Sequence, residues 1–399
     1  MNATPALGAT ESAALPSGWR WAQLGELGTY INGRAFKPDD WGTSGLPIIR
    51  IQNLNTPDAP SDRYEGLVDD GHLIADGDLL ISWSASLDAY IWDGGPAALN
   101  QHIFKVVVNE DLVTRDYLFY AVKHAMTGIR KRVHGATMQH VTKPEFVATR
   151  IPLPPLPDQQ RIAAALREQL DAAARMRAAA TRATSALSAL HESRLRDILS
   201  SVADRAYPRV ILGSVIKARN DIIHPRDNPS GHGVFVGLEH IESGTGRRAG
   251  SEEIDQATLT GRKARFHPGD IVYGYLRPYL NKVWLADFEG LCSVDQYVYV
   301  VDQEQADAGY VAGFMRSSLF LSQAPVASGH GQLPRIRLDE IARVELALPP
   351  LPEQRRIAAV LREQLDSTTH LRAAVEGQAA EIGRLTAALF RSAFLEGSS

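Results

Sequence analysis

The chain has 399 residues, of which 44% are apolar and 22% charged, as expected for a folded protein of two or three domains. The net charge of −4 gives nucleic-acid binding no support by itself, because binding depends on where cations concentrate. A single cysteine, Cys292, excludes a disulfide framework and a cysteine-based zinc finger. No run of about 18 apolar residues predicts a transmembrane helix, so we expect a cytoplasmic protein.

The first predicted segments are a flexible tail over residues 1–18 and a globular module over residues 19–152. The tail is rich in Ala, Ser, Thr and Pro and lacks the basic start of a signal peptide. Cations beside glycine-containing loops of the module are candidate DNA contacts, because Arg and Lys bind phosphates and Gln can pair with adenine. These candidates are Arg34, Lys37, Arg130, Lys131, Arg132 and Gln139. The alternative for each is an ordinary solvated loop or helix end.

A proline-rich lead-in and a long helix are predicted over residues 153–200. Proline is tolerated only in the first helical turn, and Asp158 suits a helix N-terminus. The Ala, Arg, Glu, Gln and Leu that follow are strong helix formers. Apolar residues recur at steps of three and four, so we expect a helix of about 40 residues, roughly 60 Å long.

A second module is predicted over residues 201–347. Its candidate DNA contacts are Arg219 in an early loop, Arg277 and Lys282 in an aromatic-rich segment, and Arg335 and Arg337 after a glycine loop. Alternation is expected to place Arg335 and Arg337 on one face of a strand-like stretch. The tyrosines around Arg277 are expected in the core, because aromatics at strand spacing are mostly buried.

A second lead-in and helix, over residues 348–396, reveal an internal repeat. Residues 153–171 recur as residues 348–366, an offset of 195, with 16 of 19 positions identical. Weaker echoes precede each copy: Leu24-Gly25 with Leu212-Gly213, Gly77-Asp78 with Gly269-Asp270, and Gln101 with Gln296. The order is therefore module, helix, module, helix, with near-identical helices and diverged modules.

Two near-identical helices with apolar stripes predict a coiled-coil spacer. If the halves are related by a pseudo-twofold axis, the second helix runs back along the first. We therefore expect an α+β protein of two globular modules separated by an antiparallel two-helix spacer.

The duplicated Leu-Pro-Pro-Leu-Pro-[Asp/Glu]-Gln-x-Arg-Ile-Ala-x-x-Leu run, placed after each of two diverged modules, resembles the specificity subunit of type I restriction–modification systems. The resemblance extends from about Trp19 to Phe394. It implies that the modules are target recognition domains, which read a bipartite and here asymmetric DNA site. It also implies that the chain is a non-catalytic subunit of a DNA methyltransferase and restriction complex.

The same resemblance implies two methyltransferase subunits as partners, with restriction subunits as further partners. S-adenosylmethionine is expected in the methyltransferase subunit and no cofactor in this chain. Exposed charged residues of the helices are the candidate partner contacts, each with a plain solvated helix face as its alternative: Arg161, Arg167, Glu168, Arg356, Arg362 and Glu363.

Two other functions stay open at this point. A two-headed protein–protein scaffold without DNA binding would fit the acidic net charge. An enzyme with an unrecognised site is the other, although no phosphate loop is found and the histidines lack metal-ligand spacing. We therefore predict no catalytic and no metal site in this chain.

Overall fold

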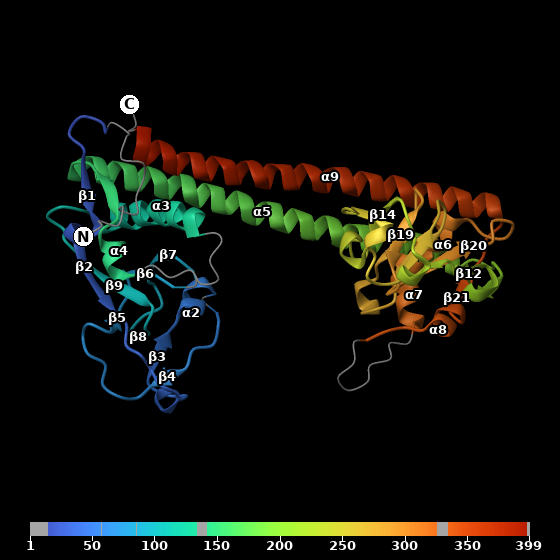
Figure 1. Ribbon diagram of the computed structural model, residues 1–399, viewed down its shortest axis with the longest axis horizontal. Helices are drawn as coiled ribbons and strands as arrows, with labels where there is room; N and C mark the ends of the chain where they lie inside the picture. The colour runs from blue at the N-terminus through green and yellow to red at the C-terminus, as the bar shows by residue number, and fades with distance from the viewer. Residues whose placement is uncertain (1–14, 57, 85, 134–141, 325–333, 397–399) are drawn as a thin grey trace. The chain divides into compact units, whose positions relative to one another are not determined.

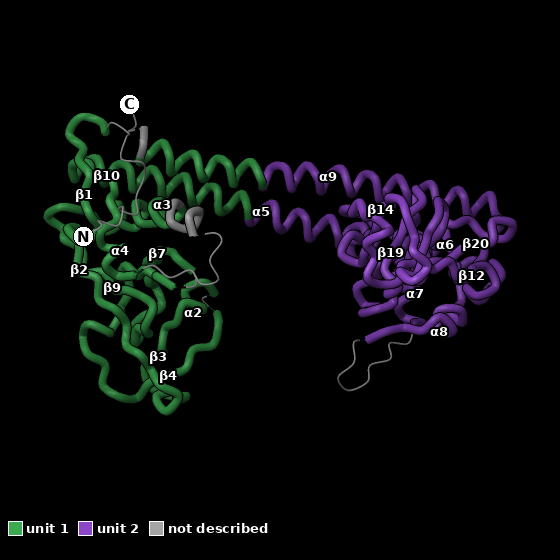
Figure 2. The backbone as a smooth tube through the Cα atoms, in the orientation of Figure 1, with its two compact units in different colours: residues 1–177, 380–399 green, residues 178–379 purple. Residues whose placement is uncertain are grey.

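The computed structural model describes residues 15–56, 58–84, 86–133, 142–324 and 334–396, apart from the side chains of residues 128–133, 395 and 396. The chain forms two compact units, residues 1–177 with 380–399 and residues 178–379 (Figure 2). Each unit contains one α+β module and a stretch of both long helices. No helix among the described residues combines the length and apolar character needed to cross a bilayer.

The module of unit 1 is built from a two-stranded ribbon, two four-stranded sheets and short helices (Figure 1). The ribbon pairs β1 (Arg20–Gln23) with β10 (Arg150–Leu153). The first sheet is antiparallel throughout, in the order β2 (Gly28–Asn32), β9 (Ile103–Val108), β6 (Leu79–Ser82), β7 (Asp88–Ile91). The second sheet has the order β4 (Arg63–Tyr64), β3 (Leu46–Ile49), β8 (Ala97–Leu99), β5 (Leu73–Ile74), with β3 and β8 parallel. The helices of this module are α1 (Leu24–Leu27), α2 (Ile51–Asn55), α3 (Arg115–Val133) and α4 (Lys143–Val147).

The module of unit 2 repeats this topology. Its ribbon pairs β11 (Arg209–Ile211) with β21 (Glu345–Ala347). Its first sheet has the order β12 (Ile216–Ala218), β20 (Gln296–Val301), β17 (Ile271–Gly274), β18 (Val283–Leu285). Its second sheet has the order β13 (Ile222–Ile223), β16 (Lys263–Phe266), β19 (Gly290–Ser293), β14 (His232–Val236), β15 (Glu252–Asp255), so only β13 is added. Its main helices are α6 (Ala308–Arg316), α7 (Ser318–Gln323) and α8 (Leu338–Ala342).

Two of the sequence echoes are equivalent in the structure and the third is not. Leu24 and Leu212 donate the same backbone hydrogen bond, to Thr149 and Val344. Gly77 and Gly269 both have positive φ, 91° and 87°, a conformation that favours glycine. The pairing of Gln101 with Gln296 was wrong by two residues. Gln296 begins β20, whose counterpart β9 begins at Ile103, and Gln101 lies in an exposed turn.

The two long helices, α5 (Leu156–Ala203) and α9 (Leu351–Arg391), run in opposite directions within each unit. In unit 1 the start of α5 shares a core with the end of α9, through Leu166 and Phe394, which follows α9 in a short π-helical turn. In unit 2 the end of α5 shares a core with the start of α9, through Leu195 and Leu361. The predicted antiparallel helix pair and α+β modules are therefore confirmed.

A buried glutamine fastens the first turn of each long helix to its module. Gln159 is fully buried; its amide oxygen accepts the Thr114 N–H at 2.8 Å and its amide nitrogen donates to two backbone carbonyls. Gln354 repeats this arrangement with the Asp307 N–H at 2.8 Å. Because both side chains are fully buried, the hydrogen bonds of each glutamine contribute more to the stability of the fold than exposed hydrogen bonds would.

We predict that Gln159→Ala destabilises unit 1 by about 3 kcal/mol, because buried backbone groups lose their partners. Hydrogen exchange should become faster at the Thr114 amide and stay unchanged at the Asp307 amide. Gln354→Ala should give the reverse pattern. Gln160→Ala, at the adjacent exposed position, is the control and should change stability by less than about 0.5 kcal/mol. Unchanged exchange in both glutamine variants would refute the role of these residues.

Candidate nucleic-acid and partner interfaces

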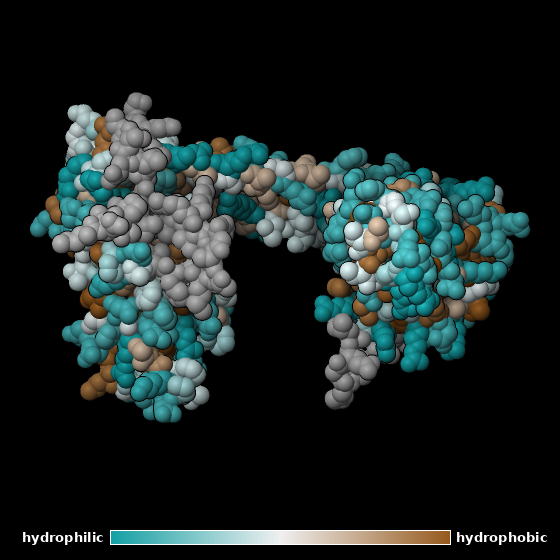
Figure 3. All heavy atoms as spheres, viewed as in Figure 1, coloured by the Kyte–Doolittle hydropathy of each residue, from teal (hydrophilic) through white to brown (hydrophobic). Residues whose placement is uncertain are grey.

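In unit 2, two predicted cationic segments lie side by side. Leu276 and Arg335 form an isolated antiparallel bridge, and the Arg277 N–H donates to the Pro334 carbonyl at 2.7 Å. Arg277 and Arg335 are 58 residues apart in sequence, yet both are exposed in this one region. The visible face of unit 2 is largely hydrophilic (Figure 3). The pairing gathers positive charge locally in a chain whose net charge is negative.

The predicted alternation across Arg335, Ile336 and Arg337 is confirmed, since Ile336 is fully buried and both arginines are exposed. The stretch is a single bridge rather than a strand of a sheet. Arg337 stands at the N-cap of α8, where its N–H donates to the Glu340 carboxylate at 2.7 Å.

The loop after Tyr275 holds a strained backbone that projects an aromatic side chain. Arg277 and Asn281 have φ values of 50° and 43°, and they flank a short 3-10 helix. Non-glycine residues rarely adopt this conformation, which costs on the order of 1 kcal/mol or more each and often marks functional sites. Tyr279, between them, is 60% exposed, so the expectation that it belongs to the core was wrong. Tyr279 and Arg277 together offer a stacking surface and a cation.

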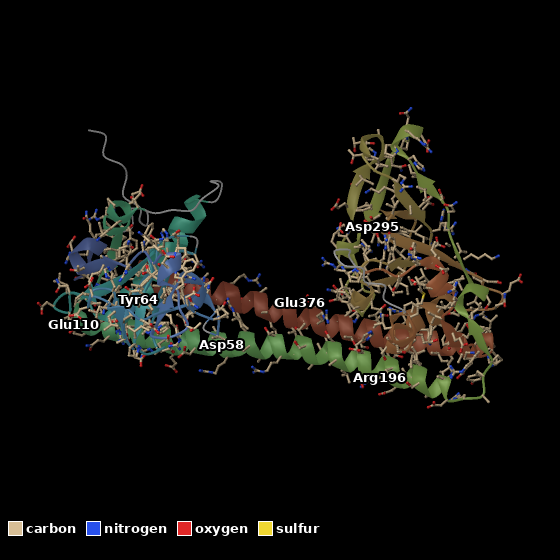
Figure 4. All side chains as sticks on the ribbon, turned by 90° about the horizontal axis from the view of Figure 1, so that it is seen from below. Asp58, Tyr64, Glu110, Arg196, Asp295 and Glu376 are labelled. Carbon is tan, nitrogen blue, oxygen red and sulfur yellow. The ribbon has the colours of Figure 1, made fainter. Side chains whose placement is uncertain are left out.

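The base of this loop is fixed by stacked tyrosines. The rings of Tyr275 and Tyr297 lie 4.4 Å apart at 21°. The Tyr275 hydroxyl donates to the Asp295 carboxylate at 3.4 Å, and Figure 4 labels Asp295 in unit 2. Burial, and then the negative charge of Asp295, raise the pKa of Tyr275, so its hydroxyl stays a donor.

Two cations of unit 2 that were predicted to contact DNA form hydrogen bonds with groups of their own module. Arg219 binds the buried Asp270 carboxylate through two hydrogen bonds of 2.7 and 2.9 Å. The Lys282 ammonium donates to the Leu238 carbonyl at 2.5 Å. Loss of Arg219 would leave the buried Asp270 carboxylate without its charge partner, and Lys282 is held by a part-buried hydrogen bond, so both cations have a structural role. Their contact with DNA stays a prediction.

The predicted contacts of unit 1 are only partly described. Arg34 lies 3.7 Å from the Asp40 carboxylate, with its guanidinium 4.6 Å from the centre of the Tyr64 ring. Lys37 is exposed in the same loop. The side chains of Arg130, Lys131 and Arg132, at the end of α3, and the whole of Gln139 lie outside the described residues.

Unit 1 carries an aromatic cluster where unit 2 carries its tyrosine loop. Trp83 follows β6, as Tyr275 follows β17, and donates through Nε1 to the Asn32 side chain at 3.1 Å. Its ring lies 4.9 Å from that of His102, which has a φ of 75°. Sequence inspection did not single out His102, because nothing local marks a non-glycine residue with positive φ.

Each unit has a groove where a long helix meets its module. The groove of unit 1 measures about 380 Å³ and that of unit 2 about 570 Å³. Both are lined by the same repeat positions: Ala163 and Arg167 in unit 1, Ala358 and Arg362 in unit 2. Asp116 in unit 1 has Gly309 as its counterpart. Arg167 is therefore paired with Asp116, whereas Arg362 forms no ion pair with any described residue.

The other candidate partner residues are exposed on the helix surface. Arg161 binds Asp158 at 3.3 Å and Arg356 binds Glu353 at 2.8 Å, both one helical turn away. Glu168 and Glu363 are exposed as well. Such exposed pairs contribute little to stability, which leaves these side chains available for a partner.

An apolar groove of about 500 Å³ lies between α5 and α9 within unit 2. Its walls include Leu190 and Leu371, which are 49% and 55% exposed. Small residues deepen it: Ala183, Ala186 and Ala374. A groove of this kind suits the apolar face of a further helix.

Among the residues that the structure describes, one cluster contains residue types that bind metals. Ligand atoms of Glu239, His240 and Glu252 lie within 4.8 Å of one another. The His240 Nδ1 accepts the Gly237 N–H at 3.0 Å, so the neutral ring carries its proton on Nε2, which points to Glu252 at 3.7 Å. The imidazole therefore acts as a donor, and this arrangement is assigned no metal.

Part of the sequence is similar to known proteins. Residues 16–176 match the family described as type I restriction modification DNA specificity domain. The chain is 30% identical over 170 residues to the type I restriction enzyme EcoDI specificity subunit of Escherichia coli, covering 43% of this chain and 37% of that protein. It is 25% identical over 151 residues to the MjaVIII specificity subunit of Methanocaldococcus jannaschii, covering 37% of this chain and 35% of that one. The matches thus span about a third of the length of these relatives.

Solved structures extend the likeness in fold to nearly the whole chain. A chain from a study of complex assembly and conformational transition in a type I restriction–modification system superposes with a TM-score of 0.74 at 18% identity, covering 96% of this chain and 98% of that chain. The HsdS subunit of Thermoanaerobacter tengcongensis gives a TM-score of 0.51 at 18% identity, with the same coverage. Residues 16–176 therefore match the DNA specificity domain family of type I restriction–modification systems, and the fold of the chain resembles that of an HsdS subunit.

Proposed function

We propose that this chain is the non-catalytic subunit that recognises DNA sequence within a type I restriction–modification complex. The observation that carries the proposal is the repeated topology: two modules whose sheets have the same order apart from the added β13, each followed by a helix that begins with a nearly identical run of residues, but with different side chains on their loops. A shared scaffold with unlike reading surfaces suits a site of two different half-sites. The target is then bipartite and asymmetric.

The local charge supports DNA as the ligand despite the net charge of −4. Arg277, Arg335 and Arg337 are exposed in one region of unit 2, beside the exposed ring of Tyr279. Arginine binds phosphates and guanine, and an aromatic ring can pack against a base or sugar. Phosphate contact needs only such a local group of cations.

Equivalent exposed positions on α5 and α9 favour a partner of which one copy binds to each long helix. Residues that are exposed in both copies do not maintain the fold, yet they are identical: Arg161 and Arg356, Arg167 and Arg362. Together with the paired grooves, they favour two copies of one partner, a methyltransferase subunit. We propose that this partner supplies S-adenosylmethionine, that restriction subunits join the same complex, and that the complex works in the cytoplasm.

We predict that the double variant Arg277→Ala, Arg337→Ala weakens DNA binding by the assembled complex. The slope of log affinity against log salt should decrease by about one for each phosphate that the variant no longer binds. Arg209→Ala, an exposed arginine on β11, is the matched control and should behave as the wild type. Fluorescence anisotropy with duplex DNA at several salt concentrations measures this. Wild-type binding that does not change with salt would favour the protein–protein scaffold instead.

We also predict that bulky residues on the repeated helix surface remove partners one at a time. Ala164→Trp and Ala359→Trp should each reduce the number of bound methyltransferase subunits from two to one, and the double variant should bind none. Native mass spectrometry counts the subunits. Ala257→Trp, at an exposed position of the short 3-10 helix Gln256–Thr258 in unit 2 that lines none of the grooves described above, is the control. Two partners on the double variant would show that this surface is not the docking site.

A further inference from the structure

A pocket of about 220 Å³ lies inside unit 2, between the C-terminal part of α5 and the module. Ser188, His191, Glu192 and Leu195 of α5 form one wall. The module contributes loop 243–245, the loop of Tyr279 to Asn281, and Arg316, Ser318 and Leu321 from α6 and α7. A water molecule occupies about 30 Å³ in the liquid, so this pocket is large enough for a small ion with several waters.

Arg316 is the charged centre of the pocket. Its Nε donates to the Ala312 carbonyl at 3.2 Å and its Nη1 to the Thr245 carbonyl at 3.0 Å. These bonds use two of the five N–H donors of a guanidinium. No carboxylate of the described residues pairs with Arg316, and burial lowers its pKa to about 10. A partly buried cation without a counter-charge is unfavourable, so an anion beside it would be stabilised.

An acidic residue in the loop beside the pocket is already engaged. Glu242, in the same loop as Thr245, accepts hydrogen bonds from Thr245, Arg247 and Arg372. Glu192 is the acidic residue among those lining the pocket, and it is exposed at the rim. Neither carboxylate neutralises Arg316.

The repeat provides an internal comparison. Tyr117 of α3 and Tyr310 of α6 make the same hydrogen bond, to the carbonyls of Pro152 and Ala347, which aligns Lys123 with Arg316. Lys123 is neutralised by Asp88, with 3.0 Å between Nζ and the carboxylate. The same helix position therefore carries a cation in both units, and among the described residues a carboxylate of the chain pairs with it in only one of them.

The pocket walls also contain buried polar atoms that lack hydrogen-bond partners among the described residues. These are Nδ1 of His191 on the helix side and Oδ1 of Asn281 on the module side. Buried polar atoms are normally satisfied, and exceptions point to a ligand or bound water that completes the network. Because Oδ1 of Asn281 is an acceptor, a water molecule or a protonated oxygen of the ion would donate to it. Burial, and then the charges of Arg316 and Arg372, lower the pKa of His191, so this region already carries excess positive charge.

We propose that this pocket binds a small oxyanion of the phosphate class, with the Arg316 guanidinium as its main ligand. Arginine presents its free N–H groups in a fork that matches two oxygens of such an ion. The ion is either free phosphate or a phosphate group of bound nucleic acid. The site stands on its own geometry and does not require the proposed DNA recognition.

Equilibrium dialysis of the full chain against radiolabelled inorganic phosphate tests the site. Arg316→Gln should weaken phosphate binding at least about tenfold, because a charge-assisted hydrogen bond is removed. Glu192→Gln should strengthen binding, since it removes a negative charge from the rim. Lys123→Gln, the equivalent position in unit 1, should leave binding unchanged.

A second variant tests the pocket independently of whether Arg316→Gln folds. Ser243→Phe narrows the mouth of the pocket, leaves the Arg316 hydrogen bonds intact, and should also weaken binding. Competition by duplex DNA would identify a backbone phosphate as the occupant, and its absence would identify the free ion. No phosphate binding by the wild type, or wild-type affinity in both Arg316→Gln and Ser243→Phe, would overturn the site. Loss of DNA binding with phosphate binding intact would contradict only the proposed function.

Discussion

The attachment of each long helix to its module depends on one buried side chain. Gln159 and Gln354 each satisfy a backbone N–H of the module and two carbonyls, one of them in the proline-rich lead-in to the helix. The prolines of the lead-in have no N–H groups and so cannot donate to these carbonyls themselves. Ile162 and Leu166, or Ile357 and Leu361, then extend the module core along the helix. The direction in which each helix leaves its module is therefore fixed by its first two turns.

Duplication has preserved this attachment while the charges around it changed. Arg167 has a carboxylate partner in Asp116, but Gly309 leaves Arg362 without one among the described residues. Lys123 has Asp88, but Arg316 has only backbone carbonyls in the described chain. Ion pairs of this kind can disappear without loss of the fold, because the core and the backbone hydrogen bonds carry most of the stability. The two halves share a fold and differ in the ligands that their surfaces suit.

The long helices and the repeat could be predicted from the sequence because their signals are local. Proline position, apolar spacing and a run of 19 nearly identical positions require no knowledge of tertiary structure. The sheet orders could not be predicted, since parallel pairs such as β3 with β8 join strands about 50 residues apart. For the same reason the sequence did not distinguish exposed cations from those that form ion pairs. Arg219, for example, pairs with Asp270, which lies 51 residues further along the chain. Tyr279 was missed because its exposure follows from positive φ at Arg277 and Asn281, which are not glycines.

The central claim is that two unlike modules read two unlike stretches of DNA. Selection of bound duplexes from a random library, by the chain assembled with its partner subunits, followed by sequencing, tests this claim most directly. We expect enrichment of two different short blocks separated by a constant number of unspecified base pairs. Enrichment of one continuous block, of two identical blocks, or of no sequence would contradict it.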